Sequence, residues 1–306
     1  GPIVGGVITQ AASWSWIFWI NVPVGIAAAV AVLLRVSDSR GPRRKLDPAG
    51  LVLGGIAALA LVWGVVQAAS TGWGNAPVLA SLAIGIIALA GLIGWERRAA
   101  QPMVPLRLFR DRGFASSSAG IFLLNASLTG VVFFTAQYLQ NAHGNGPLAA
   151  GLRLLPMGLV PLLVASWSGR TADRVGTRPM ILVGLVLGTA GPLLLAIFAP
   201  PSTPFIWLGA GMVVVALGLT LAIPALTKAI VGSVEPADVS TAAGLFSTLR
   251  QMGGAFGVAV TSAAFTASGS YANAGTVASG YRGAMIVAAI VAALGLGAVL
   301  VARKRA

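Results

Sequence analysis

The acidic side chains are the groups of this chain best suited to carry protons, and all of them lie in or beside the connections between apolar stretches. They are Asp38, Asp47, Glu96, Asp111, Asp173, Glu235 and Asp238. A carboxylate inside a membrane span is costly to bury and is therefore a functional hypothesis by default. None of these residues falls inside a predicted span, so the sequence shows no obvious intramembrane proton carrier.

Polar groups within the apolar stretches are the next candidates for chemistry. Arg250 lies well inside its stretch, next to Gln251. Two interpretations stay open for Arg250. It is either a cation that faces a cavity and pairs with an acidic group during transport, or a side chain that snorkels to the surface or bonds to backbone carbonyls. Gln251, Asn125 and Gln137 are neutral candidates for lining a cavity, with hydrogen bonding between helices as the alternative for each.

Residue counts exclude several other kinds of site. The chain has no cysteine, which removes disulfides, thiol catalysis and thiolate metal sites. It has one histidine, His143, which removes a multi-histidine metal site. No cluster of catalytic groups is visible. We therefore expect neither an enzyme nor a bound metal or cofactor.

The elements that must position these groups are strongly apolar. Of the 306 residues, 57% are hydrophobic and 9% are charged, and the mean hydropathy is +0.90. Soluble domains carry about 25% charged residues, so this composition indicates an integral membrane protein. The net charge of +13 does not indicate a nucleic-acid partner, because the basic residues lie in short segments between apolar runs.

The apolar runs predict an all-α polytopic fold, since a helix needs about 20 apolar residues to cross the hydrocarbon core. A partial crossing covers Gly1 to about Gln10. Full crossings are predicted at Trp14–Val36, Ala49–Ala69, Pro77–Trp95, Phe114–Gln140, Leu148–Trp167, Pro179–Ala199, Pro204–Val231, Ala242–Ala267 and Tyr281–Ala302. Because the chain starts inside an apolar stretch without a signal-peptide pattern, we expect a fragment of a longer protein.

The connections between these runs alternate in charge. Basic residues gather in residues 35–45, 96–112, 169–178 and 303–305, whereas residues 70–76, 141–147, 200–203 and 268–280 contain no charged side chain. Short cytoplasmic loops carry the excess of Lys and Arg, so the basic set, including the C-terminus, is predicted to be cytoplasmic. Within residues 169–178 we expect a tight turn, for which Gly169 and Gly176 supply unusual backbone angles.

Glycine and proline positions predict how the helices pack and bend. Glycine pairs four residues apart permit close contact between helices. Such pairs are Gly1 and Gly5, Gly50 and Gly54, Gly184 and Gly188, and Gly253 and Gly257. Prolines inside the spans are candidate kinks. They are Pro23, Pro156, Pro161, Pro192 and Pro224.

Several of these segments resemble one known family. Residues 169–178 resemble the cytoplasmic-loop signature of the major facilitator superfamily, with the matching positions at Gly169, Asp173, Arg174, Gly176 and Arg178. The start of the chain resembles the end of the antiporter signature in helix five of that superfamily's exporters, through Gly1, Pro2, Gly5 and Gly6. Residues 14–25 and 249–254 are similar to helices six and thirteen of the fourteen-helix drug:proton antiporter branch.

The resemblance implies a division of the chain. Residues 1–36 would be a remnant of an N-terminal bundle, 37–48 a cytoplasmic loop and 49–95 the two extra linker helices of this branch. Residues 96–113 would be a cytoplasmic connector, which is either a plain link or a short interfacial helix. Residues 114–302 would form a complete C-terminal six-helix bundle, followed by a cytoplasmic tail at 303–306.

The resemblance also implies a function. Two bundles would rock about a central site and export amphipathic drugs across the cell membrane by proton antiport. Residues 169–178 would latch the bundles together, with Asp173 paired to Arg174 or Arg178 or placed at a helix N-terminus. A well-made turn is the alternative for the same residues. Thr171 and Thr177 depart from the usual signature, which would weaken the latch.

Two other functions remain open at this stage. One is a metabolite or siderophore exporter of the same fold, and the more distant one is a non-transporting membrane receptor or sensor. The expected partners are a small amphipathic substrate and the lipid bilayer. We expect neither nucleic acid nor an obligatory protein partner, and the proton gradient would be the driving force.

Overall fold

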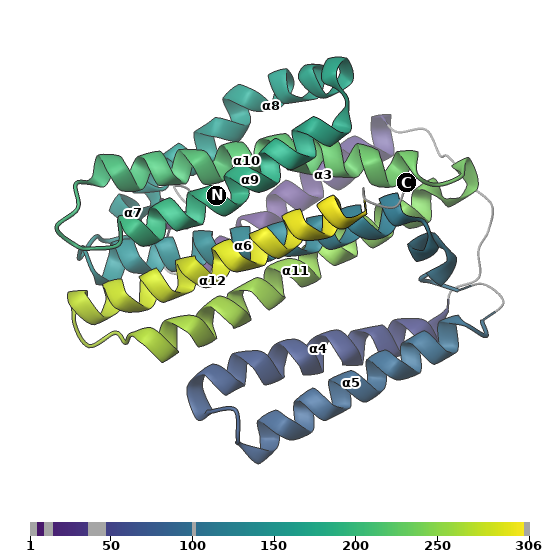
Figure 1. Ribbon diagram of the computed structural model, residues 1–306, viewed down its shortest axis with the longest axis horizontal. Helices are drawn as coiled ribbons and strands as arrows, with labels where there is room; N and C mark the ends of the chain where they lie inside the picture. Colours follow the sequence, from purple (N-terminus) through teal and green to yellow (C-terminus); the bar gives the residue numbers. More distant parts are fainter. Residues whose placement is uncertain (1–4, 9–14, 36–46, 100–101, 303–306) are drawn as a thin grey trace.

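The computed structural model describes residues 5–8, 15–35, 47–99 and 102–302, and these residues form helices and the connections between them (Figure 1). Residues 5–8 are helical. The further elements are α2 (Trp16–Trp19), α3 (Asn21–Arg35), α4 (Pro48–Thr71), α5 (Ala76–Glu96), η1 (Leu106–Arg110), α6 (Arg112–Asn141), α7 (Pro147–Arg153), α8 (Leu155–Val175), α9 (Thr177–Ile197), α10 (Phe205–Gly232), η2 (Pro236–Asp238), α11 (Val239–Ser268) and α12 (Ala274–Val301). No strand occurs within the described ranges.

Helices α6 to α12 pack into a bundle with α6 near its centre (Figure 1). Helix α6 lies between α11 and α12, while α9 packs against α10 and α12, and α8 packs mainly against α10. The core at one end of α6 is aromatic, because the rings of Tyr138 and Tyr281 stack with centroids 4.3 Å apart. Their hydroxyls are satisfied: that of Tyr138 donates to the carbonyl of Ala199, and that of Tyr281 shares a hydrogen bond with Thr135.

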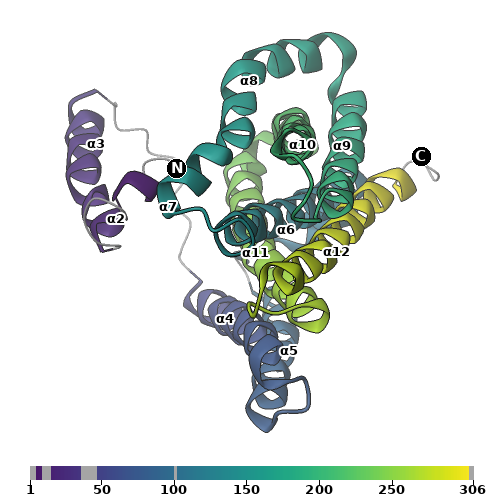
Figure 2. The ribbon, with the colours of Figure 1, turned by 90° about the vertical axis from the view of Figure 1, so that its left-hand side faces the viewer.

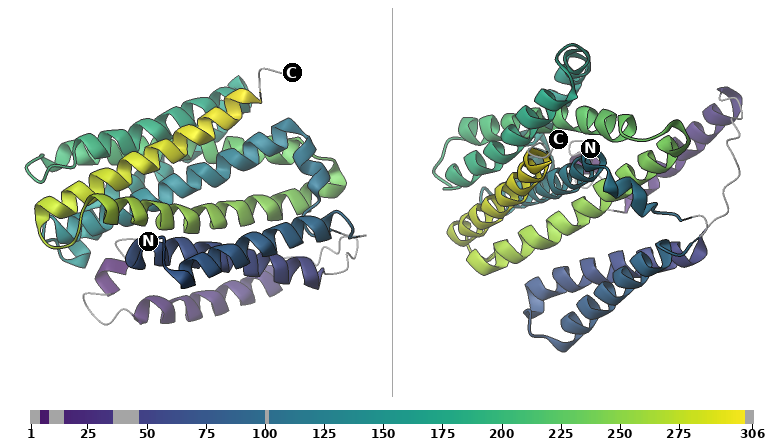
Figure 3. Two further views of the ribbon diagram at one scale, coloured as in Figure 1. Left: turned by 60° about the horizontal axis from the view of Figure 1, so that its bottom comes forward. Right: turned by 45° about the vertical axis from the view of Figure 1, so that its right-hand side comes forward.

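Helices α3, α4 and α5 lie outside this bundle. Helices α4 and α5 form an antiparallel hairpin, and α4 packs against α11 (Figure 3). Helix α3 stands apart from the bundle and has no buried residue (Figure 2). A helix that is apolar all round and unburied is typical of contact with lipid or with another membrane segment.

Eight described segments are long and apolar enough to cross a membrane, and they match eight of the predicted full crossings. The remaining prediction, Ala242–Ala267, corresponds to α11. This helix has 30 residues but is not among the eight, because Ser, Thr, Gly, Arg250 and Gln251 make it less apolar. It contacts α6, α12 and α4 rather than standing alone, so its polar positions are shared with neighbouring helices.

Two predicted boundaries are corrected by local hydrogen bonding. Helix α12 begins at Ala274 and not at Tyr281, because Asn273 and Thr276 form a capping box. The Thr276 amide donates to Asn273 Oδ1 at 3.0 Å, and the Asn273 amide donates to Thr276 Oγ1 at 3.2 Å. The predicted span Leu148–Trp167 is divided into α7 and α8 at Leu154, where Pro156 removes a helical donor.

The predicted close contacts between helices are confirmed at two glycine pairs. A β-carbon at Gly257 would overlap the carbonyl oxygen of Ala126, and one at Gly253 would overlap that of Phe122, so α11 and α6 meet backbone to backbone. Gly184 of α9 meets α10 in the same way, because a β-carbon there would lie 2.7 Å from the carbonyl oxygen of Gly218. A β-carbon at Gly188 would meet the Leu124 side chain of α6, while the backbone of Gly188 lies against Gly218 of α10. Gly54 makes only an ordinary contact with α5, and Gly1 lies outside the described residues.

Candidate functional site

The segment 169–178 is mostly helical, which corrects the prediction of a ten-residue turn. Helix α8 continues to Val175 and α9 begins at Thr177, so the corner between them is Gly176. Gly176 has φ 92° and ψ 161°, a conformation that is essentially restricted to glycine. The prediction for Gly176 is therefore confirmed. The prediction for Gly169 is wrong, because Gly169 lies within α8 with ordinary helical geometry.

Asp173 is held by a lysine from another helix. Lys228 Nζ of α10 donates to Asp173 Oδ1 at 2.6 Å. The predicted partners, Arg174 and Arg178, do not make this ion pair, and no side chain caps the start of α9. The reason is geometric. The Arg174 side chain diverges from that of its neighbour Asp173 on the helix, and Arg178 lies beyond the Gly176 corner, whereas Lys228 reaches Asp173 from the facing helix.

A buried hydrogen bond fixes the two helices just above this ion pair. Ser168 Oγ of α8 donates to the carbonyl oxygen of Thr220 on α10 at 2.9 Å, and both residues are buried. The opposite face of α8 is exposed along its length, through Leu159, Leu162 and Trp167. One face of α8 is thus fixed to the bundle at its charged end, while the other presents an apolar surface.

The second group of predicted site residues lies where α11 crosses α6. Asn125 Nδ2 donates to the backbone carbonyl of Arg250 at 2.7 Å. This is the hydrogen bond between helices that was the alternative interpretation for Asn125. A β-carbon at Gly254 would lie 3.1 Å from Asn125 Nδ2, so the glycine leaves room for the amide. Asn125 therefore helps to set the register of the two helices.

The other members of that group are not brought together. The Arg250 side chain is half-buried, and among the described residues it has no carboxylate partner. Gln251 is exposed on α11. Gln137 lies roughly 18 Å further along α6 at the helical rise, where its Oε1 accepts a hydrogen bond from Asn141 Nδ2 at 3.0 Å. Asn125 and Arg250 share one place in the fold, and Gln137 belongs to the opposite end.

The structure describes only part of the segment at the start of the chain that resembles the antiporter signature. Gly1 and Pro2 lie outside the described residues, while Gly5 and Gly6 are in the helical segment 5–8. Gly6 is buried, and a β-carbon there would lie 2.8 Å from the carbonyl oxygen of Pro147. Gly6 thus permits close contact between the start of the chain and α7.

Sequence reasoning missed a polar network at the charged end of the molecule. Asp238, 1% exposed, pairs with Arg107 of η1 at 2.7 Å, which fixes the connector 96–113 to the link between α10 and α11. Asp47 caps α4 through the Gly50 amide and accepts from Trp95 Nε1. The only signal was the position of these acids beside basic segments, and that signal was assigned to membrane topology alone.

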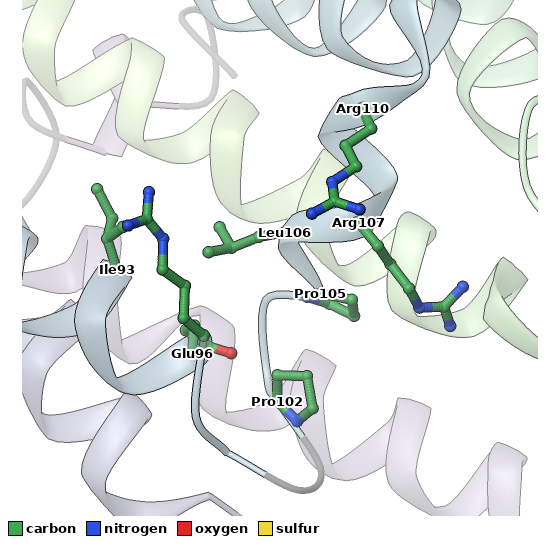
Figure 4. A pocket seen from close by; sticks show the side chains of 8 residues that line it. Ile93, Glu96, Pro102, Pro105, Leu106, Arg107 and Arg110 are labelled. Carbon is green, nitrogen blue, oxygen red and sulfur yellow. The ribbon is translucent and has the colours of Figure 1, made fainter.

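The connector was predicted to be either a plain link or a short interfacial helix, and its described residues match neither form by itself. It contains the short 3-10 helix η1, and its Leu108 is buried in the core. Between η1 and the end of α5 lies a pocket of about 500 Å³ with charged and apolar walls (Figure 4). Among the described residues, no three His, Cys, Asp or Glu side chains lie close enough together to hold a metal ion.

These features define a multi-pass helical membrane protein whose six-helix bundle carries a one-residue corner at Gly176 and an ion pair beside it. The chain belongs to the Major Facilitator Superfamily, whose family model matches residues 1–258 and 117–306. The nucleoside transporter NupG has a similar fold, with a TM-score of 0.56, 14% identity and 85% of each chain covered.

Curated relatives are similar in sequence over most of this chain. The tetracenomycin C resistance and export protein of Streptomyces glaucescens is 35% identical over 85% of this chain and 48% of its own length. The multidrug resistance protein Stp of Mycobacterium tuberculosis is 30% identical over 85% of this chain and 48% of its own length. The cephamycin export protein CmcT of Amycolatopsis lactamdurans is 33% identical over 95% of this chain and 60% of its own length. The chain spans about half the length of the first two.

Proposed function

We propose that this chain is part of a secondary active transporter that exports small amphipathic molecules, including drugs, by proton antiport with alternating access. Family membership and relatives named for drug resistance and export support this proposal. Helices α6 to α12 would form one of two rocking bundles, α4 and α5 the linker helices, and α3 with residues 5–8 a part of the other bundle.

The observation that carries the mechanism is the exposed ion pair between Asp173 and Lys228. Their side chains are 67% and 57% exposed, and a pair of this kind contributes about 0–1 kcal/mol. Such a weak pair can be exchanged at little cost for a partner on a facing bundle. Arg174 and Arg178 have no ion-pair partner within the described chain, so they too are available to the facing bundle.

The same cluster gives the proposed orientation. Arg170, Arg174 and Arg178 lie on the two sides of the corner at Gly176, and Lys228 is joined to the same end of the bundle by its ion pair with Asp173. By the positive-inside rule this end faces the cytoplasm, and so does the C-terminus of α12. The proton-antiport part of the proposal rests on the resemblance to the antiporter branch, since the described carboxylates lie at helix ends.

Transport in inverted membrane vesicles tests the proposal with the full-length protein. Drug accumulation should depend on the proton gradient and stop when an uncoupler collapses it. Asp173→Asn should lower the transport rate about tenfold, within the range typical of coupling between conformational states, without reducing insertion. Lys228→Gln is the matched control. If the two variants lower the transport rate equally, Asp173 acts only through its ion pair with Lys228. Drug accumulation that does not depend on the proton gradient would refute proton antiport.

A second candidate is an exporter of a metabolite that the cell itself makes. It is favoured by the similarity to CmcT, which is named as a cephamycin export protein. The two candidates differ in phenotype. Deletion of a metabolite exporter should remove one compound from the culture medium and leave drug sensitivity unchanged, whereas deletion of a drug exporter should raise sensitivity.

A further inference from the structure

The pocket beside η1 combines charges of both signs with an apolar wall. Arg97 and Glu96 come from the end of α5, and Arg110 comes from η1. Ile93, Pro105 and Leu106 supply apolar surface, and Figure 4 shows the Leu106 side chain between Ile93 and the guanidinium of Arg110. Nothing in the proposed transport mechanism uses this pocket.

The arginines of the pocket differ in their partners. Arg107 is engaged with Asp238, and its guanidinium points away from Glu96 (Figure 4). Arg97 and Arg110 are exposed, and within the described part of the chain neither side chain has a hydrogen bond or an ion pair. Two guanidinium groups are therefore free to bind an anion, and guanidinium matches phosphate oxygens with two parallel hydrogen bonds.

Glu96 supplies a buried hydrogen-bond acceptor that lacks a donor. It is 4% exposed, and its Oε1 accepts from the backbone amide of Val104 at 3.0 Å. Its Oε2 is buried and has no hydrogen-bond partner. A buried acceptor left without a donor is costly, so a ligand that donates an N–H to this oxygen would bind favourably.

The location indicates a membrane lipid. Ile93 lies in the last turn of the membrane-spanning helix α5, so the pocket lies at the level where phospholipid headgroups meet water. The exposed Ile86 and Ile87 on the same helix offer apolar surface to acyl chains. A simple anion would satisfy the arginines but would place a second negative charge near Glu96.

We propose that this pocket binds the headgroup of an ethanolamine phospholipid. The guanidinium groups of Arg97 and Arg110 bind the phosphate, and the primary ammonium donates to Glu96 Oε2 once the side chains that cover this oxygen move aside. A choline headgroup has no N–H to donate, and a glycerol headgroup offers only a neutral hydroxyl. The site should therefore distinguish lipids of equal chain length by their headgroups.

Native mass spectrometry of the detergent-purified protein tests this proposal. The probes are phosphatidylethanolamine, phosphatidylglycerol and phosphatidylcholine with identical acyl chains, and inorganic phosphate. We expect the ethanolamine lipid to bind about tenfold more tightly than the other two lipids, as one charged hydrogen bond provides. Inorganic phosphate should compete weakly.

Three variants separate the interactions. Glu96→Gln should abolish the preference for ethanolamine, and Arg110→Gln should weaken the binding of ethanolamine and glycerol lipids alike. Arg98→Gln is the matched control, because Arg98 is exposed next to Arg97 but does not line the pocket. Circular dichroism checks that each variant is folded. Equal binding of all three lipids, an unchanged preference in Glu96→Gln, or full displacement by inorganic phosphate would overturn the proposal.

Discussion

Replacing Gly257 with alanine is expected to push α11 away from α6. A β-carbon at this position would overlap the carbonyl oxygen of Ala126. That oxygen belongs to the backbone of α6 and cannot rotate aside as a flexible side chain would. The two helices must therefore separate until the new carbon and the oxygen reach an ordinary van der Waals distance.

The expected cost follows from the contacts that this separation loosens. Overpacking a close contact costs about 1–3 kcal/mol. Separation also stretches the hydrogen bond from Asn125 to the Arg250 carbonyl, which contributes about 0.5–1.5 kcal/mol. Alanine regains about 0.5–1 kcal/mol as the better helix former. The net destabilisation is about 2 kcal/mol, or a fall of roughly 3 °C in Tm for a chain of this size.

The measurement is thermal unfolding of the detergent-purified protein, followed by the helical circular dichroism signal. Gly244→Ala is the matched control, since Gly244 is exposed on the same helix and a β-carbon there would meet no atom within 4 Å. This control should unfold at the wild-type temperature or slightly above it. If Gly257→Ala unfolds together with Gly244→Ala, the backbone contact between α11 and α6 is refuted.

Two further predictions use the same unfolding assay. Gly176→Ala should lower the free energy of unfolding by about 1–3 kcal/mol, because the φ of 92° at this position is strained for alanine. Gly169→Ala should leave the free energy of unfolding unchanged, because Gly169 is helical and a β-carbon there meets no atom within 4 Å. Equal effects of the two substitutions would contradict the one-residue corner. His143 lies in the connection between α6 and α7, where burial and then the charge of Arg153 lower the pKa of its imidazole from 6.5. Stability should therefore fall as the pH drops through about 6.5, since the unfolded chain binds the proton more readily, and His143→Gln should flatten that loss; an unchanged profile in the variant would assign the acid sensitivity to other groups.

The membrane character of the chain could be predicted because it depends on local composition. Apolar runs identified eight segments that the structure describes as long apolar helices, and only α11 departs from the pattern. The glycine pairs of α9 and α11 were also predictable, since a missing side chain permits close approach whichever helix lies opposite.

The partners of the polar residues could not be predicted in the same way. Lys228 lies 55 residues from Asp173, and Asn125 finds a backbone carbonyl 125 residues away. Such pairs depend on the rotation and axial register of helices that touch, and no local pattern encodes either quantity. Local sequence also misplaced Gly169, since a glycine is compatible with a turn and with a helix, and only the hydrogen bonds of α8 decide between them.

By itself, the sequence determined that this chain crosses the membrane many times, where its helices run and which ends carry the charge. Hydropathy and charge are sums over neighbouring residues, so both can be obtained from the sequence without knowledge of the fold. The tertiary structure decided which charges are paired, that Glu96 is buried with one oxygen unsatisfied, and that Asp173 is held by Lys228. Each of these depends on distances between helices, which only packing sets.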